Sequence, residues 1–286
     1  MKINIENILG ISEKEIKLFG KVKSIIINNY EYEEGSVFSK HLLSKYIYKY
    51  DENGNIIEYN HYKSDGSLNR KRTYKYDENG NIIESNDILN ESYDRTLIIR
   101  YDKNVNNIEW SWHGSDGYSS EKNTARYDEN GNIIEENEFW QGKFTYNYDV
   151  NGNEIEWNWY LNDGILYKKH TKQYDVNGNE IEFNFYEYGE LVSTKTCKYD
   201  ENGNTIEDNR IHHDDEDADW ERTTYSYGYD ENGNIIEKNC YKSDRSLEYK
   251  HTYRYEFDEK NNYIKSIKYL NDNPKSIIER EIEYFN

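Results

Sequence analysis

Polar and apolar positions alternate along most of this chain, in short runs that turn-forming residues interrupt at regular intervals. Side chains alternate between the two faces of a β-strand, so this pattern predicts half-buried strands. The run Tyr-Asp-Glu-Asn-Gly-Asn-Ile-Ile-Glu at residues 76–84 recurs nearly unchanged from Tyr50, Tyr127 and Tyr229. Looser copies begin at residues 101, 148, 174, 199 and 257. Such a fixed period predicts a repeat array.

Each of the nine units, which are spaced by 21 to 30 residues, predicts two strands. The first strand ends in Tyr-x-Tyr-Asp, and the turn Asp-Glu-Asn-Gly leads into a second strand, Asn-Ile-Ile-Glu-x-Asn-x-Tyr. Short turns join antiparallel neighbours, so the units predict an all-β antiparallel meander of about 18 strands, in units of about 26 residues. Because strands twist, so wide a sheet coils or closes. The candidate shapes are a twisted or wrapped sheet, a spiralling partial shell and a large barrel, and the pattern does not choose between them.

The N-terminal part, residues 1–45, is predicted to differ from the array at residues 46–286. Residues 12–19 combine the spacing of a capping box with apolar positions, which predicts one short amphipathic helix. Two strands are predicted at residues 21–33 and 37–50. We expect this helix and hairpin to cap the first exposed edge of the array, because the terminal units of repeat proteins are atypical.

The recurring motif Tyr-Asp-x-x-Gly-Asn in an all-strand chain resembles the YD repeats of Rhs-type proteins, and the resemblance covers most of residues 46–270. In that family, the repeats build a spiralling β-shell that encloses a toxin or forms surface assemblies. This chain has far fewer repeats than a full shell, and its only proline, Pro274, does not belong to an Asp-Pro self-cleavage motif. No toxin-sized domain is expected after the array. The resemblance therefore implies the fold rather than an activity, and it suggests an immunity or accessory factor beside toxin genes.

The second strand of each unit carries the most variable positions. A recurring Glu and Asn share one face, where we expect hydrogen-bonded ladders, and two variable residues share the other face. In the middle of the array the variable residues are mostly aromatic. The candidate partner-binding aromatics are Trp110, Trp112, Trp157, Trp159, Phe183 and Phe185, together with Trp140 in the shortened fourth unit. Either these rings pack inside a wrapped sheet, or they form an aromatic strip for a partner.

Charge narrows the choice of partner. The formal net charge is −20, which argues against binding nucleic acid through phosphate contacts and fits a basic protein partner. An insertion in the seventh unit concentrates acidic residues, and its candidate partner-binding residues are Asp214, Asp215, Glu216, Asp217 and Asp219. The run lacks the order of ligands in a calcium-binding loop, so it is either a solvated loop or a docking site for a basic partner.

We find no constellation for catalysis, no cofactor motif and no metal motif, so an enzyme is not expected. The two cysteines, Cys197 and Cys240, do not form a disulfide framework. Neither a secretory signal nor a membrane-spanning apolar segment is visible, so a cytoplasmic location is expected.

The leading hypothesis is a non-catalytic repeat scaffold that binds another protein, most concretely an immunity or antitoxin-like factor that neutralises a basic toxin. The alternatives are a carbohydrate-binding or cell-surface module that uses the same aromatic residues, and a structural shell component.

Overall fold

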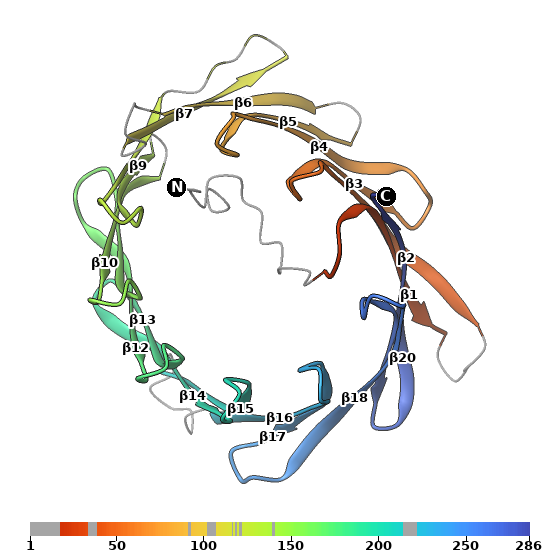
Figure 1. Cartoon of the computed structure of the whole chain (residues 1–286). Coiled ribbons are helices and arrows are strands. Elements are labelled where there is room, and N and C mark those ends of the chain that lie inside the picture. Colours follow the sequence, from red (N-terminus) through yellow and green to blue (C-terminus); the bar gives the residue numbers. More distant parts are fainter. Residues whose placement is uncertain are drawn as a thin grey trace.

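The chain forms one closed ring of antiparallel strands (Figure 1). The structure is a computed structural model that describes residues 18–33, 39–90, 93–101, 107–115, 117, 119, 122–138, 141–213 and 222–286. Within these residues each strand pairs with the next one along the chain, and the first strand, β1, also pairs with the last, β20. The sheet therefore closes into a 20-stranded barrel instead of ending as a partial shell.

The strands are β1 Val22–Tyr32, β2 Lys40–Tyr50, β3 Ile56–Lys63, β4 Leu68–Tyr76, β5 Ile82–Leu89, β6 Tyr93–Tyr101, β7 Asn107–Gly114, β8 Asn123–Tyr127, β9 Ile133–Glu138, β10 Gly142–Tyr148, β11 Glu154–Tyr160, β12 Leu166–Tyr174, β13 Glu180–Glu187, β14 Glu190–Tyr199, β15 Thr205–His212, β16 Arg222–Tyr229, β17 Ile235–Tyr241, β18 Leu247–Phe257, β19 Tyr263–Leu270 and β20 Asn273–Tyr284. The nine predicted units correspond to β2–β19, which are 18 strands, and β1 and β20 complete the ring.

The described residues contain no helix. Residues 12–17 of the predicted N-terminal helix lie outside the described part, and Leu18 and Phe19, its predicted end, are irregular rather than helical. The two predicted N-terminal strands are present as β1 and β2. The division of the chain at residue 45 stays a prediction.

The two ends of the chain together form a tenth unit. Tyr284 at the end of β20 pairs with Val22 of β1, and a bulge follows at once, as it does where Tyr50 pairs with Ile56 inside a regular unit. The repeat that closes the ring is therefore split, with its first strand at the C-terminus and its second strand at the N-terminus.

The turn of this split unit is also reproduced. The Phe285 amide donates to the Lys21 carbonyl at 2.9 Å, just as the Asp51 amide donates to the Asn55 carbonyl at 2.9 Å in the first unit. Gly20 has a φ of 84°, the same value as the turn glycine Gly54. Backbone geometry closes this turn without a continuous chain, which explains how a sequence lacking the motif completes the barrel.

The turn aspartate of each described unit organises its own loop. In the fifth unit the Asp149 carboxylate accepts the backbone N–H groups of Asn151 and Asn153 at 2.8 and 2.9 Å, and the Asn153 side-chain amide at 2.9 Å. These hydrogen bonds from Asn153 lower the pKa of Asp149. The motif Asp-x-Asn-Gly-Asn is thus explained by local turn chemistry.

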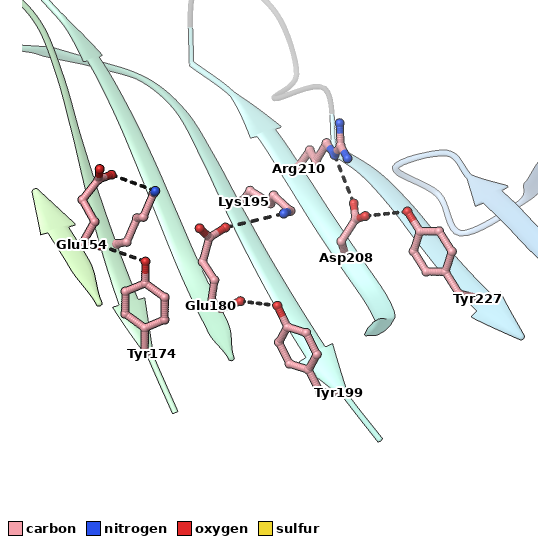
Figure 2. A network of polar contacts seen from close by, with 9 residues as sticks. Glu154, Tyr174, Glu180, Lys195, Tyr199, Asp208, Arg210 and Tyr227 are labelled. Atoms are coloured by element: carbon pink, nitrogen blue, oxygen red, sulfur yellow. Dashed lines mark hydrogen bonds and ion pairs between the residues drawn. The ribbon is translucent and has the colours of Figure 1, made fainter. Parts of the chain in front are cut away.

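In five of the described units the tyrosine of the motif ties the unit to the preceding one. Its hydroxyl donates to the carbonyl of the first residue in the preceding second strand, as from Tyr174 to Glu154 at 2.8 Å and from Tyr199 to Glu180 at 2.6 Å (Figure 2). In the ninth unit the anchor position holds Phe257, and Tyr255, two residues earlier, supplies the hydroxyl to the Ile235 carbonyl.

This anchor gives a matched pair of substitutions. The Tyr101 hydroxyl donates to the Ile82 carbonyl at 2.7 Å, whereas the buried Tyr127 hydroxyl has no hydrogen-bond partner among the described residues. Tyr101→Phe is expected to lower the free energy of unfolding by about 1 kcal/mol, and Tyr127→Phe to leave it unchanged or raise it. Urea denaturation measures both. Equal losses in the two variants would contradict the role given to the anchor hydroxyl.

The variable residues of the second strands face the inside of the ring. The described chain approaches β1 from within the ring (Figure 1), where Leu18 packs against the cluster of Ile25, Ile27 and Tyr48. Tyr48 pairs with the variable residue Tyr59, so both side chains lie on this inner face. The recurring Glu and Asn therefore lie on the outer face.

The lumen is wide. Twenty strands spaced by about 4.8 Å have a perimeter of about 95 Å, which gives a backbone diameter of about 30 Å, or about 40 Å with the tilt usual for barrels. Allowing about 5 Å for side chains on each side leaves roughly 20–30 Å, which exceeds the 10–12 Å diameter of a helix. The side chains of the inner wall thus line a space that they do not fill.

Candidate functional site on the inner wall

A pocket of about 450 Å³ lies on the inner wall between β9 and β12. Its lining combines aromatic rings with several titratable groups, which is typical of binding sites. The lining residues are Glu136, Glu138, Gln141, Phe144, Tyr146, Glu154, Trp157, His170 and Lys172. All of them belong to β9–β12 except Gln141, which precedes β10.

The aromatic part of this pocket is a row of rings that crosses neighbouring strands. Trp157 lies between Phe144 and His170, with ring centroids 5.8 and 5.1 Å apart and interplanar angles of 25° and 15°. The indole N–H of Trp159 donates to the Gln141 carbonyl at 2.6 Å, and its ring lies 5.5 Å from that of Phe144. Because the rings hold one another in place, they present a preformed apolar surface to the lumen.

A polar network borders this row. Glu154 accepts hydrogen bonds from His170 at 2.7 Å and from Lys172 at 2.8 Å. Burial opposes ionisation of Glu154, but these two partners outweigh it and lower the pKa of its carboxyl. Similar pairs follow along the inner wall, where Glu180 lies 3.6 Å from Lys195 and Asp208 is held between Arg210 and Tyr227 (Figure 2).

Two carboxyl groups at the other side of the pocket, those of Glu136 and Glu138, have raised pKa values, whereas that of Glu154 is lowered. Burial raises the pKa of Glu136, the nearby Glu138 raises it further, and a hydrogen bond from Tyr146 only partly offsets both effects. Burial also raises the pKa of Glu138. Neither forms an ion pair with a described residue. The pocket therefore combines paired with unpaired carboxyl groups, and the unpaired ones are suited to receive a cationic or hydrogen-bond-donating group.

This contrast predicts opposite pH dependences. Because the folded-state pKa of Glu136 is raised, wild-type stability falls as pH rises above the unfolded value of about 4.3. Glu136→Gln keeps an acceptor for Tyr146, so it is expected to unfold at higher urea concentration than wild type at pH 8, with no difference below about pH 4.

Glu154→Gln is the control of opposite sign. Its lowered pKa contributes stability above the unfolded value, and this contribution is lost as pH falls through the folded value. Glu154→Gln is therefore expected to destabilise the protein at pH 8. Urea midpoints between pH 4 and pH 8 that change alike in both variants would contradict the assigned pKa directions.

The structure separates the aromatic residues predicted from the sequence. Trp110 is 3% exposed and belongs to a hydrophobic cluster with Leu97 and Ile108, so its role is packing. Trp112 packs against the same cluster and lies under the Arg95 guanidinium, 4.1 Å from its ring. The half-buried residues are Trp157, Trp159, Phe183 and Phe185, which face the lumen on β11 and β13. Trp140 and the acidic residues at 214–219 lie outside the described part of the chain.

Phe183 and Phe185 extend the row of rings beyond the pocket. The Phe183 ring lies 5.2 Å from that of His170, and the Lys168 ammonium lies 5.6 Å from the Phe185 ring. The residues that connect the candidates, such as Tyr146, His170 and Lys172, come from first strands. The variable positions that stand out in the sequence all lie on second strands. Applying the same two-residue alternation to the first strands would have placed Tyr146, His170 and Lys172 on the same face.

The outer face differs from the predicted Asn ladder. Asn158 donates to Glu156 of its own strand at 2.9 Å, and Glu156 accepts Lys169 of β12 at 2.5 Å. Equivalent Asn residues bond to a Thr or Ser of the adjacent strand, as Asn86 accepts Thr96 at 2.7 Å. Asn residues of successive units cannot stack, because a first strand always separates two second strands.

Among the described residues there is no cluster of three or more His, Cys, Asp or Glu side chains arranged to hold a metal ion. The described part of the chain also has no helix that is long and apolar enough to cross a membrane.

Comparison with known proteins gives no family for the chain, because no family model and no curated protein sequence matches it. Solved structures with a similar course of the chain exist at low similarity. A chain of TcdB2-TccC3-TEV is 14% identical at a TM-score of 0.40, with 83% of this chain and 15% of that chain covered. A chain of the Photorhabdus luminescens Tc holotoxin pore is 11% identical at a TM-score of 0.40, with 84% of this chain and 17% of that chain covered.

A porin-like protein from Bacteroides uniformis is 13% identical at a TM-score of 0.39, with 93% of this chain and 99% of that chain covered. The chain spans about a sixth of the length of the two toxin chains. At these TM-scores the similarities carry no conclusion about what this protein does.

Proposed function

We propose that the protein is a non-catalytic binding protein that holds a segment of another protein against its inner wall at β9–β13. The observation that supports this proposal is the row of rings around the half-buried Trp157, which lies beside the carboxyl groups of Glu136 and Glu138, neither of them ion-paired with a described residue. Tryptophan side chains are frequent anchors of protein interfaces, and desolvated carboxylates favour basic side chains. The estimated lumen is wide enough for an extended strand or a helix.

The partner in this proposal is a basic protein. The chain carries a net charge of −20, which accelerates association with a cationic partner at low ionic strength. In its most concrete form, the proposal makes this chain a neutralising factor that captures part of a basic toxin. A structural shell is the weaker alternative, because the pairing of β1 with β20 leaves no free sheet edge for assembly among the described strands.

The test is affinity capture from the host that carries the gene, with bound proteins identified by mass spectrometry at low and moderate salt. Wild type is compared with a Trp157→Ala/Trp159→Ala double variant. The matched control is Tyr186→Ala, which removes an aromatic ring from the outer face of the same wall, where Tyr186 pairs opposite Lys169. Circular dichroism confirms that each variant is folded.

The proposal predicts one stoichiometric basic partner that is retained by Tyr186→Ala, released by salt and lost in the double variant. A partner that binds the folded double variant as well as wild type would contradict binding at this wall. Binding of glycans instead, detected on a glycan array and lost in the double variant, would replace the protein partner by a carbohydrate.

A further inference from the structure

A second charged cluster lies on the inner wall, away from the pocket, at β4–β6. Its centre is Asp87, whose side chain is buried completely. Arg70 holds it through two hydrogen bonds, from Nε at 2.7 Å and from Nη2 at 2.5 Å. Arg95 reaches the same carboxylate from β6 at 3.1 Å, and Nε of Arg72 lies 3.4 Å from it. Three guanidinium groups thus converge on one carboxylate.

The cluster has a surplus of charge and of donors. Three Arg and one Asp give a local charge of +2 within a chain of net charge −20. Each guanidinium has five N–H donors, whereas the carboxylate has about four acceptor positions. Asp87 therefore accepts only a minority of the donors that surround it, and the exposed donors of Arg70 and Arg95 can take a second acceptor.

Other ion-paired carboxylates of the inner wall have fewer cationic partners than Asp87. Glu187 pairs with Lys168, and Asp208 pairs with Arg210, in each case one cation to one carboxylate. Glu154 receives Lys172 and His170. The repeat does not require three arginines around one carboxylate. In the seventh unit, Arg210 occupies the position that Asp87 has in the second unit, and it forms an ion pair with one aspartate, Asp208.

The geometry fixes two of the guanidinium groups while leaving them accessible. The side chains of Arg70 and Arg95 are 26% and 29% exposed, whereas that of Arg72 is 6% exposed. The Arg95 guanidinium lies 4.1 Å from the centre of the Trp112 ring, which restrains its plane. Planar donors that are held in this way suit the paired oxygens of a carboxylate or a phosphate group.

We propose that Arg70, Arg72 and Arg95, oriented by Asp87, form a binding site in the lumen for an oxyanion, namely a carboxylate or a phosphate group. The anion accepts the N–H donors that Asp87 leaves unused, and it neutralises the local excess charge. The site is independent of the pocket at β9–β12, so either one stands if the other fails.

Titration calorimetry with inorganic phosphate and, separately, with acetate tests the site at low ionic strength. Wild type is compared with Arg95→Gln and with Arg95→Lys, which keeps the charge but removes the planar fork. The control is Arg210→Gln, whose guanidinium is already paired with Asp208. Urea midpoints verify that every variant is folded, and Arg70→Gln replaces any Arg95 variant that does not fold.

The expected result is saturable binding with a stoichiometry of one, weakened at least tenfold by Arg95→Gln, less by Arg95→Lys, and less than twofold by Arg210→Gln. Binding of phosphate but not acetate assigns the site to phosphate groups, and binding of both includes carboxylates. The absence of saturable binding of either anion to wild type, or equal weakening by Arg95→Gln and Arg210→Gln, would overturn the proposal. The Trp157→Ala/Trp159→Ala variant is expected to bind the anion like wild type.

Discussion

Replacing Asp87 by Asn is expected to lower the free energy of unfolding by about 3–5 kcal/mol, because it removes the only negative charge from a cluster of three buried or half-buried guanidinium groups. Burial opposes ionisation of Asp87, but Arg70, Arg72 and Arg95 outweigh it and lower the pKa of its carboxyl. The side chain keeps its size in this variant, so the loss reports the uncompensated charge rather than a cavity. Urea denaturation at pH 7 measures it.

Asp208→Asn is the matched control. Asp208 is also buried on the inner wall, at 3% exposure, but a single guanidinium group, that of Arg210, pairs with it, and its other hydrogen bond comes from the Tyr227 hydroxyl. The Arg210 side chain is 47% exposed, so water compensates its charge when the carboxylate is lost. We expect a loss of about 1–2 kcal/mol in this control. A loss for Asp87→Asn that does not exceed the loss for Asp208→Asn would show that the arginine cluster is not held by its carboxylate.

Replacing Gly142 by Ala is expected to cost about 3–5 kcal/mol, the sum of a left-handed backbone conformation and an overpacked contact. Gly142 begins β10 with a φ of 102°, and a Cβ atom at this position would lie 2.2 Å from the carbonyl oxygen of Tyr160. That oxygen belongs to the backbone of the neighbouring strand, so the contact cannot be relieved by rotating a side chain. The shortened connection between β9 and β10 depends on this close approach.

The control for this variant is Gly152→Ala in a regular turn. Gly152 has a φ of 85°, and nothing lies within 4 Å of the added Cβ position. Only the cost of the left-handed backbone conformation remains for Gly152→Ala, and it is about 1–2 kcal/mol. Similar urea midpoints for the two variants would contradict the contact between Gly142 and Tyr160. Because Gly142 is adjacent to the pocket residue Gln141, Gly142→Ala is also expected to weaken partner capture.

The strands and turns were predictable from the sequence because each turn carries its own chemistry. Asp149 and Gly152 specify one turn by hydrogen bonds and backbone conformation that involve no distant residue. Closure of the ring was not predictable, because the tenth unit has no motif. It uses Phe285 and Gly20, from opposite ends of the chain, and only the backbone hydrogen bond and the φ of Gly20 reveal the equivalence.

The candidate site was predictable in part for a related reason. The aromatic positions on second strands, such as Trp157 and Trp159, stand out in the alternating pattern. Their partner His170 becomes visible only when the register between β11 and β12 is known, because Trp157 pairs directly opposite His170. The arginine cluster also spans three strands, so its charge ratio cannot be derived from any single unit.

Closure by a split repeat is the central claim, because it creates the lumen in which both proposed sites lie. Ser24 of β1 and Glu283 of β20 lie opposite each other, and the Ser24 hydroxyl donates to the Glu283 carboxylate at 3.1 Å. Directly opposed strand residues have the separation that a disulfide requires. We would therefore measure disulfide formation in a Ser24→Cys/Glu283→Cys variant by peptide mapping under non-reducing conditions.

The predicted result is a disulfide within one chain, formed efficiently in the folded monomer. A Ser24→Cys/Glu207→Cys variant, whose second cysteine lies on β15, is expected to form none. If the first variant instead stays reduced, or links two chains into a dimer, then β1 and β20 of one chain do not pair, and the closed barrel is wrong.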